Sequence, residues 1–110
     1  MIKDGSVMEF KEIKEKIIKV GHIYANKFNI NMDDDWFVLK IQEEIGELTS
    51  AHLKLTGRAR LDNQSKVELD KNFRDEIADV IAMTILFAHH KGIDVESALK
   101  QKWFKHIDSE

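Results

Sequence analysis

The sequence predicts an all-α domain built as a four-helix bundle, and three observations favour this fold class. The 110 residues contain no proline and only five glycines, so few positions interrupt a helix. Apolar residues recur every three to four positions, which is the spacing of an amphipathic helix. A chain of this length supports one folding unit, so we expect residues 1–110 to form a single domain.

The first two helices are expected over residues 7–28 and 34–56. In the first, the apolar positions follow the helical spacing; they are Ile13, Ile17, Val20, Tyr24 and Phe28. The acidic residues Asp33 to Asp35 can cap the second helix and favour its dipole, and Gly57 is a natural C-terminal cap.

The other two helices follow a polar segment at residues 58–70, which we expect to be a loop. The third helix should run from about Leu69 to Lys91 and stop at Gly92. Asp94 then caps a shorter fourth helix that reaches about His106.

The third helix is apolar around its whole circumference between Ile77 and Ala88, where Asp79 is the single charged residue. Such a helix must be covered on every side, and three other helices are few for that task. We therefore expect a homodimer or homotetramer with Ala82, Ile85 or Leu86 near the contact. A well-covered central helix in a monomer is the alternative.

Composition excludes several classes of protein. A chain without cysteine has no disulfide framework and no cysteine-ligated zinc. Its net charge of −3 argues against binding to nucleic-acid polymers or anionic membranes. The N-terminal residues lack the apolar core of a secretory signal, and no apolar run reaches the roughly 20 residues of a membrane span. We expect a cytoplasmic protein.

Two helices carry carboxylates beside their apolar faces. These five residues, which we call the carboxylate cluster, are Glu43, Glu44 and Glu47 on the second helix and Glu76 and Asp79 on the third. Trp36 and Lys40 share the arc of the second helix that carries the first three. The neighbouring arc is expected in the core; it holds Phe37, Ile41, Ile45, Leu48 and Leu55.

The cluster differs from an ordinary solvated acidic face. In the first helix, Glu12 and Glu15 each precede a lysine by four residues, as exposed ion pairs do. The cluster has no such partners apart from Lys40, and half-buried carboxylates 4 Å apart repel by roughly 4 kcal/mol per pair at an effective dielectric near 20. It therefore needs raised pKa values or a cation, and hard oxygens select Mg²⁺ or Mn²⁺.

Two further features bear on this interpretation. Gly46 inside a helix costs about 1 kcal/mol relative to alanine, which close approach of the facing helix or of a ligand would offset. A ferritin-like di-iron bundle requires Glu-x-x-His, and no histidine of this chain has Glu three residues before it.

The motifs IQEEIGEL, DEIADV and KGIDVESALKQKW resemble the MazG-like all-α nucleoside triphosphate pyrophosphohydrolases, over about Trp36 to His106. The resemblance implies a Mg²⁺-dependent hydrolase that releases a monophosphate and pyrophosphate. It also implies Glu44, Glu47, Glu76 and Asp79 as metal ligands, Glu43 as the catalytic group acting on water, and Lys102 as a phosphate contact. His106 replaces the asparagine that the family often has.

Several assignments stay open at this stage. Trp36 can stack on a base or pack in the core, and Lys40 can contact phosphate or pair with Glu44. Further candidates for substrate contact are His22, Asn26, Arg58, Arg60 and His106. Two functions compete: a hydrolase cleaning the nucleotide pool, and a non-catalytic module that binds a nucleotide or partner protein around a structural divalent metal.

Overall fold

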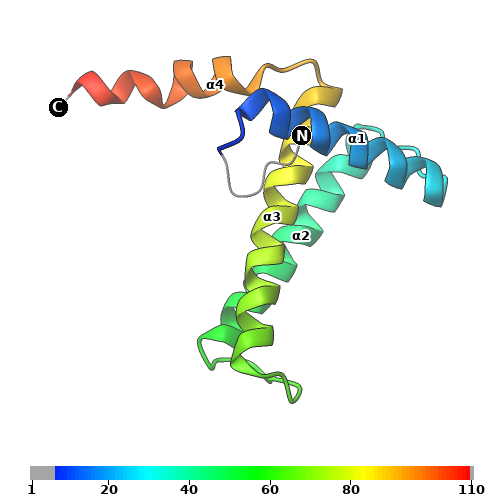
Figure 1. Cartoon of the computed structure of the whole chain (residues 1–110), viewed down its shortest axis with the longest axis vertical. Helices are drawn as coiled ribbons and strands as arrows, with labels where there is room; N and C mark the ends of the chain where they lie inside the picture. Colours follow the sequence, from blue (N-terminus) through cyan, green and yellow to red (C-terminus); the bar gives the residue numbers. More distant parts are fainter. Residues whose placement is uncertain (1–6, 110) are drawn as a thin grey trace. The chain divides into compact units, whose positions relative to one another are not determined.

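The computed structural model describes residues 7–109, and every regular element in that range is helical (Figure 1). The four α-helices and a closing 3₁₀ helix are α1 (Phe10–Phe28), α2 (Asp34–Leu55), α3 (Lys66–His90), α4 (Val95–Lys102) and η1 (Phe104–Ser109). The predicted all-α class with four helices is confirmed. Within the described range, no helix is both long and apolar enough to cross a bilayer.

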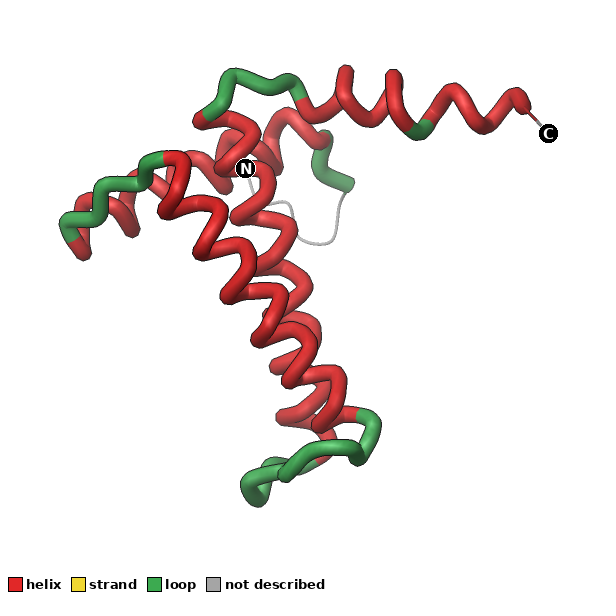
Figure 2. The backbone as a smooth tube through the Cα atoms, turned by 180° about the vertical axis from the view of Figure 1, so that it is seen from behind, coloured by secondary structure: helices red, strands yellow, loops and turns green. Residues whose placement is uncertain are grey.

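The chain divides into two compact units. The hairpin unit, Met32–Thr84, contains α2 and most of α3, which lie side by side in the views of Figures 1 and 2. The terminal unit contains α1, the end of α3 from Ile85 onward, α4 and η1. The single domain expected from chain length stays a prediction.

Local capping rules account for both ends of α2. The Asp33 carboxylate accepts a hydrogen bond from the Trp36 amide at 2.8 Å, as predicted for the N-terminal cap. At the other end, Gly57 has a φ of +74° and the Arg58 amide donates to the Leu53 carbonyl at 2.8 Å. This is a Schellman motif, which needs a left-handed residue at the glycine position.

The third helix begins at Lys66, three residues before the predicted start. Ser65 and Glu68 form a capping box: the Ser65 amide donates to Glu68 Oε1 at 2.9 Å, and the Glu68 amide donates to Ser65 Oγ at 3.2 Å. The helix ends before Gly92, whose φ is +69°. The Ser-x-x-Glu signature was present in the sequence, so the predicted loop was too long.

Two other predicted boundaries were wrong. The first helix starts at Phe10 rather than at residue 7, because Glu9 is extended and its side chain provides no cap. The Asp94 cap of α4 is confirmed, with the carboxylate accepting from the Ser97 amide at 3.3 Å. However, α4 ends at Lys102, and the residues around His106 form a 3₁₀ helix instead of continuing the α-helix.

The buried apolar side chains among the described residues are few: Phe37, Leu69, Ile85 and Leu86. Leu86 packs directly on the backbone of α1, since a Cβ added at Gly21 would lie 2.8 Å from Leu86 Cδ2. Ile85 and Leu86 are both buried within their own chain. The predicted homodimer or homotetramer, with Ala82, Ile85 or Leu86 near the contact, stays a prediction.

Other apolar positions of the hairpin unit remain open to solvent. Ile77 and Ile81 of α3 are 38% and 53% exposed, so this chain does not cover α3 on every side. Ile45 of α2 is 41% exposed, and its predicted core position was wrong. A two-helix hairpin has one internal face, and residues on the outer arcs have nothing from the hairpin to pack against.

The two helical glycines differ in their surroundings, and this difference gives a test. Nothing among the described residues lies within 4 Å of a Cβ built at Gly46, so the predicted close approach of the facing helix was wrong. We expect Gly46→Ala to raise the free energy of unfolding by about 0.5–1 kcal/mol, because alanine is the better helix former. The free energy of unfolding of Gly21→Ala should be at least about 1 kcal/mol lower than that of Gly46→Ala, because Leu86 must shift to make room for the new methyl group.

Urea unfolding followed by circular dichroism measures both variants against the parent. The helix propensity gained is the same in the two variants, so the difference between them reports packing alone. Equal stabilities for Gly46→Ala and Gly21→Ala would contradict the packing of Leu86 on α1.

Candidate functional site

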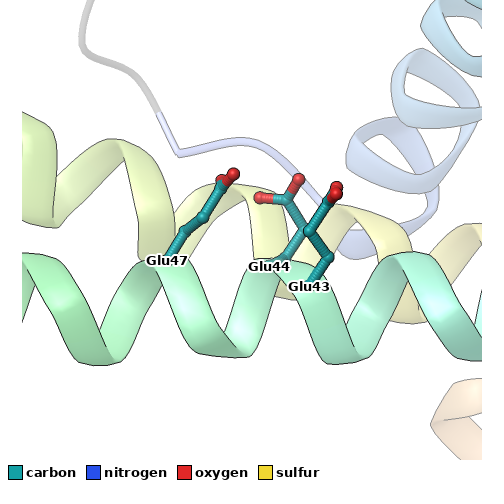
Figure 3. A group of neighbouring side chains, drawn as sticks. All are labelled: Glu43, Glu44 and Glu47. Atoms are coloured by element: carbon teal, nitrogen blue, oxygen red, sulfur yellow. The ribbon is translucent and has the colours of Figure 1, made fainter.

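The structure brings together all five residues of the carboxylate cluster. Glu43, Glu44 and Glu47 leave α2 on the same side, as expected from their spacing of one, three and four residues (Figure 3). One oxygen of each lies within 4.8 Å of the others. A second group with the same separation joins Glu44 to Glu76 and Asp79 of α3. Glu44 thus belongs to both groups and links the two helices.

Glu44 is the buried charged residue of the hairpin unit, at 7% exposure. Its Oε1 lies 3.7 Å from the Lys40 ammonium, and its Oε2 is buried with no hydrogen-bond partner. An unsatisfied buried carboxylate oxygen is costly unless the group is protonated or meets a cation.

The pKa of Glu44 reflects this environment. Burial raises the pKa from its usual 4.5 to about 7, with further increases from the negative charges of Glu47 and Asp79. Lys40 acts in the opposite direction but is the weaker influence. Near neutral pH and without a cation, Glu44 therefore exchanges between its protonated and ionised forms.

The pKa of Glu76 is raised by its surroundings, including Glu47 of α2. Burial raises the pKa of Glu76, and the charge of Glu47 together with a hydrogen bond between the two carboxyl groups raises it further. Two carboxyl groups can hydrogen-bond only if one carries a proton. The Oε2 atom of Glu76 is buried and, like that of Glu44, has no hydrogen-bond partner.

These observations test whether the site suits a divalent cation. The available ligand atoms are all carboxylate oxygens, and two of them are buried without a hydrogen-bond partner. The pKa values of Glu44 and Glu76 are raised, because the ionised forms are unfavourable there. Hard oxygen ligands of this kind fit Mg²⁺ or Mn²⁺. The residues therefore fit such an ion, and Glu44 is common to both groups.

Lys40 and Trp36 lie at one end of the cluster. The Lys40 ammonium donates to Glu43 Oε1 at 2.8 Å, so Lys40 pairs with both Glu43 and Glu44. Trp36 is half-buried and packs edge-on against Phe37, with ring centroids 5.1 Å apart. Trp36, Lys40 and Glu43 also line one hollow of about 230 Å³ with Leu39.

The remaining candidates are placed elsewhere. Lys102 is the last residue of α4 and His106 lies in η1; both are exposed and belong to the terminal unit. His22 and Asn26 are exposed on α1, and Arg60 is exposed in the α2–α3 loop.

Arg58, in the same loop, is held by the end of α2. Its Nε donates to Thr56 Oγ1 at 3.0 Å, and its guanidinium lies 3.0 Å from His52 Nε2. The structure thus gives Arg58 local partners at the end of the helix.

A second hollow at the other end of the cluster was missed by sequence reasoning. It has a volume of about 170 Å³, and Glu47 and Glu76 line it together with Ser50, Lys54 and Asn72. A signal was present: Glu47, Ser50 and Lys54 are spaced by three and four residues and so share a face of α2. Only the structure shows which residues of α3 face them, namely Leu69, Asn72 and Glu76.

Comparisons of this chain with protein-family models, with curated proteins and with solved structures return no significant match. The likeness to the MazG-like hydrolases therefore rests on the motifs themselves. The function has to be argued from the chemistry of the site.

The raised pKa of Glu44 predicts how stability depends on pH when no metal is present. A folded-state pKa above the unfolded value stabilises the protein at low pH, and this stability is lost as pH rises through about 7. Between pH 5 and pH 8 in EDTA, we expect a loss of about 2–3 kcal/mol from this group. In the Glu44→Gln variant, the free energy of unfolding should change much less with pH over this range.

Chemical denaturation at several pH values measures the effect, with Glu15→Gln on the exposed face of α1 as the matched control. The control should keep the parent profile. A Glu44→Gln profile as steep as that of the parent would mean that Glu44 is not the titrating group.

Proposed function

We propose that this protein is a Mg²⁺-dependent nucleoside triphosphate pyrophosphohydrolase of the MazG-like type, which converts a nucleoside or deoxynucleoside triphosphate to its monophosphate and pyrophosphate. One observation carries the proposal. Glu44 is buried, belongs to both sets of neighbouring carboxylates, and has an oxygen without a hydrogen-bond partner. Phosphoryl chemistry depends mainly on positioning and charge neutralisation, which such a site supplies once it holds a cation.

The proposal assigns a role to each predicted residue. Glu44, Glu47, Glu76 and Asp79 hold the ion, which when bound neutralises phosphate charge and lowers the pKa of a bound water. Glu43, at the solvent edge with a 56% exposed side chain, orients the attacking water and accepts its proton. Sharing of Glu44 between two groups is compatible with two ions in the working complex.

Substrate contacts complete the proposed site. The hollow beside Trp36 offers an indole for stacking on a base, and Lys40 can exchange its pairing with Glu43 for a phosphate. Lys102 is proposed as a phosphate contact from the motif resemblance alone. Removal of unwanted nucleotides is the role this chemistry suggests.

A non-catalytic module with a structural metal is the competing function. A structural ion could be held by Glu44, Glu76 and Asp79, and such a site has no use for Glu43. Glu43 lies within 4.8 Å of Glu44 and Glu47, and its presence beside the shared residue favours the hydrolase. Hydrolysis assays decide between the two.

Pyrophosphate release from a panel of nucleoside and deoxynucleoside triphosphates with Mg²⁺ tests the proposal. Glu47→Gln and Asp79→Asn should each reduce kcat/KM at least a hundredfold, because they remove ligand charge without changing side-chain volume. Exposed Asp35→Asn and Glu15→Gln serve as matched controls and should retain parental activity. No hydrolysis by the parent, or activity within tenfold for both cluster variants, would overturn the assignment.

Thermal melts test cation binding independently of catalysis. Millimolar Mg²⁺ or Mn²⁺ should raise the Tm of the parent relative to EDTA, because an ion that binds only the folded state stabilises it by mass action. Glu44→Gln, which alters the residue shared by both groups, should lose most of this shift. A metal-dependent shift without hydrolysis would favour the non-catalytic module.

We further propose that the chain forms a homodimer or homotetramer. The outer arcs of the hairpin unit carry exposed apolar residues, including Ile45 of α2 and Ile77 and Ile81 of α3. A second hairpin packed on them would build a four-helix arrangement and bury these side chains.

A charge on this surface tests the assembly. Ile81→Glu should weaken self-association by several kcal/mol by placing an unpaired charge in the contact. Val20→Glu, at a position 64% exposed on α1 and outside the hairpin unit, provides the control. Light scattering at micromolar concentration measures both, and a parent protein that runs as a 12.8 kDa monomer would refute the assembly.

A further inference from the structure

We propose that the hollow formed by Ser50, Lys54 and Asn72 beside the carboxylate cluster binds the pyrophosphate end of the substrate. This inference rests on the proposed hydrolase function and adds the direction in which a triphosphate lies along α2. The nucleoside is then at the Trp36 end, and the leaving group is at the Lys54 end.

The hollow adjoins the proposed ion site and lies wholly within the hairpin unit. Glu47 and Glu76 belong both to its lining and to the carboxylate cluster. Leu69 and Ala51 supply apolar lining, and Leu69 is buried. A group bound in this hollow would therefore lie beside carboxylates that would hold the cation.

The polar side chains of the hollow match the chemistry of a phosphate chain. Lys54 offers an ammonium group, Ser50 a hydroxyl and Asn72 an amide NH₂, and all of these donate hydrogen bonds. Pyrophosphate presents only acceptor oxygens and several negative charges. Charge-assisted hydrogen bonds from lysine to phosphate are among the strong ones.

The two hollows have different lining residues, and this difference indicates which end of the substrate lies in each. The hollow at Trp36 contains an indole and Leu39, which suit the flat apolar face of a base, and its lysine is paired with Glu43 and Glu44. The hollow at Lys54 contains no aromatic side chain among its lining residues. Glu43 borders the hollow at Trp36, and Glu47 borders the hollow at Lys54. These two residues are about 6 Å apart along the axis of α2, so a triphosphate chain can reach from one hollow to the other across the cluster.

Asp62 provides an internal competitor for the bound anion. The Lys54 ammonium lies 3.2 Å from Asp62 Oδ2 in the α2–α3 loop. A phosphate in the hollow would have to share Lys54 with this carboxylate. Removing the charge of Asp62 should therefore strengthen anion binding, whereas removing Lys54 should weaken it.

Isothermal titration calorimetry on the full chain measures these opposite effects. The probes are pyrophosphate and a nucleoside monophosphate, each with Mg²⁺, because Glu47 and Glu76 repel a free anion. Lys54→Met keeps the apolar stem and should weaken pyrophosphate binding at least tenfold, with monophosphate binding within twofold of the parent. Asp62→Asn should tighten pyrophosphate binding about threefold; asparagine tolerates the φ of +54° at this position.

Two controls keep the test specific. Lys66→Met removes an exposed lysine of the same unit that does not line the hollow, and it should bind both probes as the parent does. Trp36→Ala should show the reverse pattern, with weakened monophosphate binding and nearly parental pyrophosphate binding.

Each alternative outcome has a distinct meaning. If Lys54→Met binds pyrophosphate as the parent does, the inference is overturned. It is also overturned if this variant loses as much affinity for the monophosphate as for pyrophosphate, or more, because the nucleoside would then lie in this hollow. A parent that hydrolyses triphosphates but does not bind pyrophosphate also overturns it and leaves the proposed function standing. A parent that neither hydrolyses nor binds nucleotides overturns the proposed function itself.

Discussion

The burial of one carboxylate between two helices is the constraint on which the site depends. When α2 and α3 pair, Glu44 lies against Glu76 and Asp79 with an oxygen that has no donor. The pairing is compatible with this charge only if a proton or a cation neutralises it. Stability, pH and the proposed ion binding would therefore be coupled through the same residue.

The hairpin unit combines this polar site with a small apolar interior. Phe37 and Leu69 are its buried apolar side chains among the described residues, and Ile81 remains exposed. A chain with so little buried apolar surface has limited free energy with which to offset an uncompensated charge. Both proposed partners would stabilise the folded hairpin unit. The cation would neutralise the carboxylate cluster, and a second chain would cover the exposed apolar residues on the outer arcs.

The site also has a polarity along α2. At one end Trp36 and Lys40 border Glu43, and at the other end Lys54 borders Glu47. A linear substrate with one flat apolar end and one multiply charged end matches this order. At both ends a carboxylate pairs with the lysine, Glu43 with Lys40 and Asp62 with Lys54.

The sequence by itself determined the features that depend on near neighbours. Helical periodicity and caps such as Asp33 and Gly57 placed the helices, and spacing placed Glu43, Glu44 and Glu47 on one face, because these rules act within a few residues. Only the tertiary structure decided that Glu44 is buried while Glu43 is exposed, that Ile85 and Leu86 are covered by their own chain, and that Lys54 meets Asp62. Those outcomes depend on which helix or loop packs against each residue, and no local pattern carries that information.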